Sequence, residues 1–124
     1  MANNNSKNTI RTFRDPIVWQ KGKSLACEMY RATRAMPRSE MFGLTNQMRR
    51  AGYSIPSNIA EGYAKRTRPE YLRGLNIAAG SLAELQTQWE IAIELELIKP
   101  NARVDAMLLE QDRLISSLVN KLSQ

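Results

Sequence analysis

Apolar and small residues recur along most of the chain at alternating intervals of three and four positions. This spacing keeps one face of an α-helix turned towards a core. Four such segments follow one another from about residue 15 onwards. No segment shows the competing pattern of a β-strand, in which apolar and polar residues alternate. The pattern therefore predicts an all-α protein built from four amphipathic helices.

The first helix is expected to run from Asp15 to about Ala35. Asp15 can accept hydrogen bonds from the free amides of a first turn, and Pro16 suits the first helical position. Pro37 ends the helix. Cys27, the only cysteine, lies among apolar residues and is predicted to be buried, with a reactive thiol as the alternative. The apolar seam of this helix consists of Val18, Gly22, Leu25, Met29, Ala32 and Met36.

The second helix is expected to begin at a Ser39 cap and to contain a proline, Pro56, in its interior. The residue four positions before Pro56 is Gly52, which leaves room for a distorted turn, so we expect a kink and not a break. Ser54 and Ser57 flank the proline and could hydrogen-bond the freed backbone groups. The seam consists of Met41, Leu44, Met48, Ala51, Ile55, Asn58 and Gly62.

A capping box, Thr67 with Glu70, starts a long third helix that extends to about Leu97. Pro100 and Asn101 form the next turn. The third seam consists of Leu75, Ala78, Leu82, Leu85, Trp89 and Ala92, and the fourth of Val104, Leu108, Gln111, Ile115, Leu118 and Leu122.

Short connections between successive helices favour antiparallel neighbours, so the expected fold is an up-down-up-down four-helix bundle. The long third helix and the Pro-kinked second helix are its distinguishing elements. Residues 13–124 are assigned to this single bundle domain, and the polar residues 1–12 to a disordered N-terminal arm.

The composition excludes several classes of protein. No stretch reaches the roughly 18 consecutive apolar residues of a membrane span, and the first residues are polar where a signal peptide is apolar. A cytoplasmic location without membrane association is therefore expected. Histidine is absent, and a single cysteine cannot form a structural zinc site. We expect no metal, no cofactor and no enzymatic activity.

The net charge of +6 is unevenly distributed, because residues 1–73 carry +9 and residues 74–124 carry −3. Such asymmetry favours an acidic partner, and nucleic acid is the usual one. The alternatives are basic residues that only keep the bundle soluble, and halves that attract each other. The basic side chains proposed to contact RNA or DNA are Arg31, Arg34, Arg38, Arg49, Arg50, Lys65, Arg66 and Arg68.

Three polar residues of the second helix are unusual for a plain bundle. Asn58 falls on the apolar seam, which indicates a hydrogen-bonded core amide or, alternatively, a ligand contact. Glu61 could pair with Lys65 on the same helix or with an arginine of a neighbouring helix or subunit. An enzyme that uses Glu61, Tyr53 and Lys65 is disfavoured, because no nucleophile and base pair is visible.

The remaining features concern packing. Trp89 is predicted to lie in the core, whereas Trp19 lies on a first turn that is exposed on one side and is a candidate for a subunit interface. Gly80 and Ser81 weaken the middle of the third helix, which suggests a close helix approach within the bundle or between subunits.

The run QMRRAGYSIPSNIAEG at residues 47–62, with VWQKGKSLA at 18–26 and IAAGSLAEL at 77–85, resembles the four-helix bundle family of 23S ribosomal RNA intervening sequence proteins. That family includes relatives of the accessory variability protein of diversity-generating retroelements. The resemblance extends from Phe13 to about Leu97, and Pro56, Asn58, Glu61 and Gly62 belong to its most specific motif. It implies a four-helix subunit, a homopentamer and nucleic-acid binding without established enzymatic activity.

Two functional hypotheses remain. The first is a non-enzymatic oligomeric bundle that binds nucleic acid electrostatically through its basic surface. The second is a protein–protein scaffold, or an accessory subunit of a nucleic-acid enzyme. Binding that weakens steeply with salt would favour the first, and a protein complex that survives nuclease treatment would favour the second.

Overall fold

The structure, a computed structural model, describes residues 11–124, and that part of the chain is all-helical. Two short 3₁₀ turns lie in the connection between the first two helices, at Thr33–Ala35 and Arg38–Glu40. The N-terminal arm predicted for residues 1–12 lies outside the described residues, except for its last two. The four long helices are α1 (Ile17–Ala32), α2 (Leu44–Ala64), α3 (Arg68–Glu94) and α4 (Ala102–Leu122).

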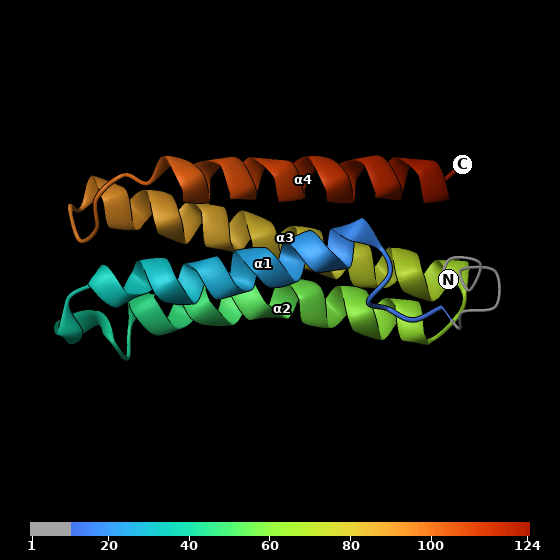
Figure 1. Cartoon of the computed structure of the whole chain (residues 1–124), viewed down its shortest axis with the longest axis horizontal. Coiled ribbons are helices and arrows are strands. Elements are labelled where there is room, and N and C mark those ends of the chain that lie inside the picture. Colours follow the sequence, from blue (N-terminus) through green and yellow to red (C-terminus); the bar gives the residue numbers. More distant parts are fainter. Residues whose placement is uncertain (1–10) are drawn as a thin grey trace, which may run out of the picture.

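Successive helices run in opposite directions along one common axis (Figure 1). Each helix packs against two others, since α1 contacts α2 and α4, and α3 contacts the same two. α3 is the longest at 27 residues, which corresponds to about 40 Å. The predicted all-α four-helix bundle with a long third helix is therefore confirmed.

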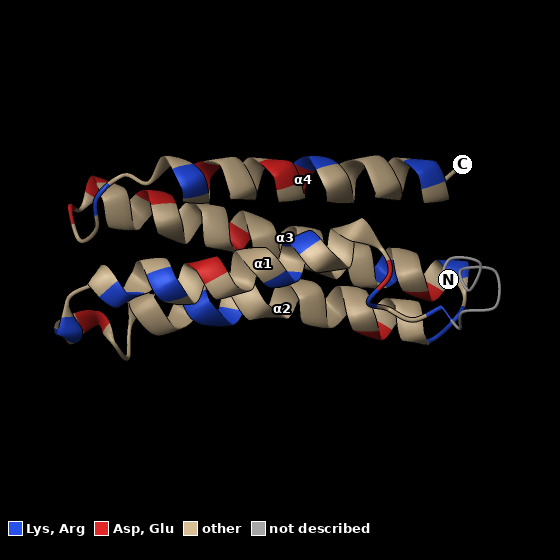
Figure 2. Ribbon diagram, in the orientation of Figure 1, with Lys and Arg blue, Asp and Glu red and all other residues tan. Residues whose placement is uncertain are grey.

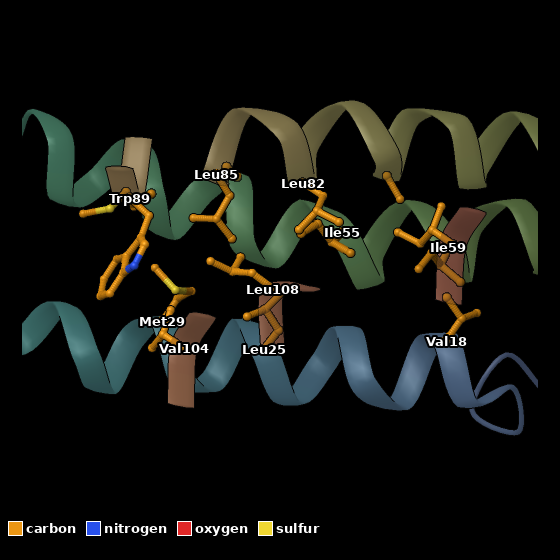
Figure 3. Close-up of a cluster of buried hydrophobic side chains, with 14 of the residues drawn as sticks. Val18, Leu25, Met29, Ile55, Ile59, Leu82, Leu85, Trp89, Val104 and Leu108 are labelled. Carbon is orange, nitrogen blue, oxygen red and sulfur yellow. The ribbon is translucent and has the colours of Figure 1, made fainter. Parts of the chain in front are cut away.

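The core lies along the axis of the bundle, where side chains from all four helices meet (Figure 3). Every seam residue predicted for α3 is buried, and Trp89 is only 3% exposed. The Trp89 indole Nε1 donates a hydrogen bond to Asp105 Oδ1 of α4 at 3.2 Å. Gln111 is the polar member of the fourth seam, and its Nε2 donates to the Val18 backbone oxygen at 3.0 Å. These two contacts link α4 to α3 and α1 respectively.

Two predicted helix caps are wrong. Asp15 does not cap α1, because its carboxylate instead accepts a hydrogen bond from the Thr12 amide, at 2.9 Å, and Pro16 occupies the cap position. Ser39 does not cap α2 either, because it lies inside a 3₁₀ turn and the helix begins at Leu44. Glu40 Oε1 accepts from the Leu44 amide at 3.3 Å in its place. In both cases a turn before the helix uses the residues that were expected to start it.

The boundary between α2 and α3 is as predicted in part. Thr67 Oγ1 accepts from the Glu70 amide at 3.3 Å, so the threonine cap is confirmed. The Glu70 carboxylate, however, lies 3.7 Å from Lys65 Nζ and not at the Thr67 amide. An ion pair across the turn therefore replaces the second half of the capping box.

Cys27 is exposed, so its predicted burial is wrong. The core seam of α1 passes through Leu25 and Met29, which are both buried. Residue 27 is two positions from each, and two positions correspond to about 200° around a helix. The thiol therefore points away from the core, although its neighbours in the sequence are apolar.

The helix α2 continues through Pro56 without a break. Pro56 is buried. Ser57 Oγ donates to the Tyr53 carbonyl at 2.8 Å, and Ser54 Oγ donates to the Ala51 carbonyl at 2.8 Å. The serines thus bond the carbonyls on either side of the Gly52 carbonyl that lost its partner. The predicted kink at Pro56 stays a prediction.

The helices α2 and α3 approach each other closely at Gly62 and Gly74. A Cβ on Gly74 would lie 2.5 Å from the backbone oxygen of Asn58, and one on Gly62 would lie 2.7 Å from that of Glu70. Both distances are shorter than van der Waals contact allows, so each position requires glycine. The specific motif of α2 therefore includes a residue that brings two backbones together.

Within residues 11–124, none of the helices combines the length and the apolar character that crossing a membrane requires.

Candidate nucleic-acid interface

Basic residues gather at both ends of the bundle (Figure 2). At one end, α1 passes through the 3₁₀ turns into α2, and at the other end the three-residue turn 65–67 joins α2 to α3. The α1–α2 cluster consists of Arg31, Arg34, Arg38, Arg49 and Arg50, and the α2–α3 cluster consists of Lys65, Arg66 and Arg68. The antiparallel topology separates the two clusters by the length of α2.

Arg49 and Arg50 have different environments although they are adjacent. Arg49 is half-buried, and its Nε donates to Thr33 Oγ1 at 2.9 Å while Nη2 donates to the Tyr30 carbonyl at 3.4 Å. Its guanidinium carbon lies 4.6 Å from the centre of the Tyr30 ring. Arg49 thus holds the C-terminal end of α1, where a positive charge is favourable. Arg50 is exposed.

The other arginines of the α1–α2 cluster are exposed. Arg31 Nη1 lies 3.4 Å from Glu28 Oε1. Within residues 11–124, no ion pair or side-chain hydrogen bond engages Arg34, Arg38 or Arg50. These three guanidiniums are therefore the ones most available to an anionic partner.

In the α2–α3 cluster, Arg66 is notable for its backbone. Its φ of 64° lies in the left-handed region, which costs a non-glycine residue roughly 1–2 kcal/mol. Arg68 Nη1 donates to the backbone oxygen of Gln124 at 3.4 Å, and Lys65 pairs with Glu70. Arg66 thus presents an exposed guanidinium at a position where glycine would be easier to accommodate.

The motif residues Asn58 and Glu61 of α2 have different environments. Asn58 is half-buried and its Nδ2 donates to the Ser54 carbonyl at 2.7 Å. Glu61 is exposed, and the ion pair expected with Lys65 is not formed, because Lys65 pairs with Glu70. Pairing of Glu61 with another subunit stays a prediction. In the part of the chain that the structure describes, no hydrogen bond or ion pair joins Glu61, Tyr53 and Lys65.

Trp19 is half-buried, since it packs against the core and its ring contacts that of Phe13. The two ring centres lie 5.3 Å apart at an interplanar angle of 72°. Lys23 Nζ lies 5.6 Å from the centre of the Trp19 ring. The sequence predicted Trp19 as a residue of a subunit interface, and that role stays a prediction.

Sequence reasoning missed a bridge between α1 and α4. Glu28 Oε1 lies 3.4 Å from both Arg31 Nη1 and Arg103 Nε, so one carboxylate holds arginines of two helices. The spacing of Glu28 and Arg31 on one helix can be seen in the sequence. The second partner of Glu28, Arg103 of α4, lies 75 positions further along the chain. Among residues 11–124, no three acidic or thiol side chains lie close enough together to hold a metal ion.

A protein-family model described as 23S rRNA-intervening sequence protein matches residues 14–120 of the chain. A search of curated proteins found no match to the chain.

Proposed function

Because the chain belongs to the family of 23S rRNA-intervening sequence proteins, we propose that it is a non-enzymatic, oligomeric helical bundle that binds nucleic acid electrostatically. Its site is the exposed part of the two basic clusters. The observation that carries this proposal is that Arg34, Arg38, Arg50 and Arg66 are exposed and unpaired among the described residues. Contacts of this kind bind phosphates without reading the sequence of bases.

The proposed binding is to RNA or DNA in the cytoplasm, and the arginines act by releasing the counterions that surround the phosphates. Arg49 is not part of the proposed contact surface, because its guanidinium is engaged with α1. Arg31 is retained, since its side chain is 61% exposed despite the ion pair with Glu28.

We test this proposal by the fluorescence polarisation of labelled RNA and DNA oligonucleotides over a range of salt concentrations. Log affinity falls linearly with log salt concentration. The double variant Arg34→Gln/Arg38→Gln should make this slope shallower by about 1.5, because two phosphate contacts are lost. The matched control, Arg113→Gln/Lys121→Gln on α4, removes the same charge outside the α1–α2 cluster and should change the slope less. No binding at low salt, or affinity that does not depend on salt, would contradict the proposal.

The proposed assembly is a homo-oligomer, with the homopentamer that the resemblance implies as its expected size. Apolar side chains exposed on one chain support it. Phe42 is 96% exposed in the α1–α2 connection, and Leu95 is 63% exposed just after α3. A ring would repeat both basic clusters on every subunit and so increase affinity by multivalency.

The second candidate function is a protein–protein scaffold or accessory subunit. It is favoured by an apolar groove of about 800 Å³ beside the α3–α4 connection, lined by Ala32, Ala35, Ile93, Leu97 and Ile98 among others. A partner protein that stays bound after nuclease treatment, and is lost on Leu97→Asp, would support this function. A partner released by nuclease would support nucleic-acid binding instead.

A further inference from the structure

A polar groove lies between α1 and α4, and Arg31 of the α1–α2 cluster is part of its lining. It has a volume of about 350 Å³, and its lining includes Trp19, Lys23, Ser24, Cys27, Arg31 and Arg103. Three of these side chains are cationic, and the single carboxylate in the lining is that of Glu28. The groove therefore carries an excess of positive charge. Figure 2 shows basic segments both on α1 and on the first turn of α4 that borders it.

Glu28 arranges the two arginines of this groove. Its side chain is only 13% exposed, whereas those of Arg31 and Arg103 are 61% and 71% exposed. A guanidinium has five N–H donors, and a single contact to Glu28 engages only part of each. Each guanidinium lies 3.4 Å from Glu28 Oε1, and most of its N–H donors remain open to solvent. The free N–H donors of both guanidiniums are of the kind that hydrogen-bond phosphate oxygens.

Trp19 provides a different kind of contact in the same groove. Its ring contacts that of Phe13, and the flexible side chain of Lys23 places Nζ over the ring, 5.6 Å from its centre. A nucleobase can stack on a half-exposed indole, and a neighbouring cation can contact the following phosphate. From Trp19 to Arg31 the helix α1 rises by about 18 Å, which is enough for a few nucleotides.

We infer that the α1–α4 groove binds a single strand of nucleic acid, with a base stacked on Trp19 and a phosphate held by Arg31 and Arg103. This inference rests on the proposed function and deepens it, since it assigns a strand preference to one surface. In a duplex the base faces are already stacked on one another, so Trp19 can contact only an unpaired base. The groove therefore binds single strands in preference to duplexes.

Cys27 serves as the reporter for the first experiment, because it is the only cysteine of the chain, is exposed and lines the groove. The rate at which a thiol-reactive dye modifies the full chain is measured alone, with single-stranded RNA or DNA of about twelve nucleotides, and with a duplex of equal length. The single strands should slow the reaction several-fold, and the duplex should slow it much less.

The second experiment compares variants by fluorescence polarisation with the same single strands. Arg103→Gln should weaken binding several-fold and abolish the protection of Cys27. Arg113→Gln removes the same charge from the same helix outside the groove and is the matched control. Trp19→Leu keeps an apolar side chain against Phe13 but removes the stacking surface, and should weaken single-strand binding by about fivefold or more. Circular dichroism checks that each variant is folded.

The inference is overturned if Cys27 reacts at the same rate with and without single strands, or if it is already protected in the free protein. It is also overturned if Arg103→Gln weakens binding no more than Arg113→Gln. Salt-dependent binding in these cases leaves the proposed function standing and removes only the groove. Absence of any binding at low salt removes both.

Discussion

At the scale of single residues, the basic side chains differ in what they are free to do. Arg49 uses its guanidinium to hold the end of α1, whereas Arg50 is exposed beside it. Arg31 and Arg103 share one carboxylate, and Arg66 has an unusual backbone conformation. Net charge alone therefore overstates the number of cations that can meet a phosphate.

Tyr71 carries a prediction about pH. Burial of its hydroxyl, together with repulsion from the neighbouring Tyr63, raises the pKa of Tyr71 above its usual value of about 10. The unfolded chain then loses this proton at a lower pH than the folded chain does. The stability linked to Tyr71 is thus fully present below about pH 10 and is lost as the pH rises through the raised pKa.

Urea unfolding between about pH 8 and pH 11 measures this effect. The free energy of unfolding of Tyr71→Phe should fall less steeply at the alkaline end than that of the unaltered protein. Tyr53→Phe, at an exposed position, is the control. Equal alkaline slopes for the two variants would contradict the explanation.

Residue-level prediction worked where a position alone decides the environment. Trp89 and the other seam residues of α3 are buried as predicted, because their spacing places them all on one face. Cys27 was misassigned because the apolar character of its neighbours was given more weight than its own direction. The Glu28 bridge was missed, since the sequence does not show which positions of α1 and α4 lie opposite each other.

At the scale of helices, the apolar seams predicted which helices form. Hydrogen-bonded turns before α1 and α2 decided where these helices begin. The turn before α1 engages Asp15 with Thr12, and the turn before α2 contains Ser39. Hydrogen bonds of this kind compete with a cap on equal terms, because both satisfy a backbone amide. The start of α3 at Thr67 was predictable because the proline two positions on favours helical backbone there.

The approach of α2 and α3 gives a prediction at this scale. Gly74→Ala should lower the free energy of unfolding by about 1–3 kcal/mol, because the new Cβ would meet the Asn58 carbonyl. The matched control is Gly80→Ala on the same helix, where a Cβ meets nothing within 4 Å. Within a single subunit this change should instead raise stability by up to about 1 kcal/mol.

Chemical denaturation of both variants measures the two effects. A loss of stability for Gly80→Ala as large as that for Gly74→Ala would contradict the clash with the Asn58 carbonyl as the cause. An unchanged stability for Gly74→Ala would mean that the two helices can separate at little cost.

At the scale of the whole molecule, Gly80 bears on assembly. The predicted close approach within the bundle is wrong, since Gly80 is exposed and its surroundings are open. The other interpretation of Gly80, a close approach between helices of two subunits, stays a prediction. Ile77 and Ile91 lie at positions three before and eleven after it, are exposed, and fall close to the same side of α3. This side is the one we expect to face a neighbouring subunit.

Multi-angle light scattering tests that expectation. The unaltered protein should have the mass of an oligomer, and Gly80→Arg should lower it, because a charged side chain would enter the contact. Ser116→Arg adds the same group to an exposed position of α4 and should leave the mass unchanged. A monomeric unaltered protein would contradict the ring.

The candidate site was predictable only in outline. The sequence identified every basic side chain of the two clusters as a candidate phosphate contact. It could not identify the α1–α4 groove, since Arg31 and Arg103 become neighbours only when the first and last helices pack together. A site shared by the two chain ends of a bundle depends on the fold as a whole.

The near-contact of Gly62 and Gly74 also has a consequence in time. Only three residues join α2 to α3, so little chain entropy is lost when these two helices meet. We expect this pair to associate early in folding, with α1 and α4 docking onto it later. In stopped-flow refolding, Gly74→Ala should then slow folding more than it accelerates unfolding. The helical hairpin would thus be a folding nucleus as well as a closely packed part of the native protein.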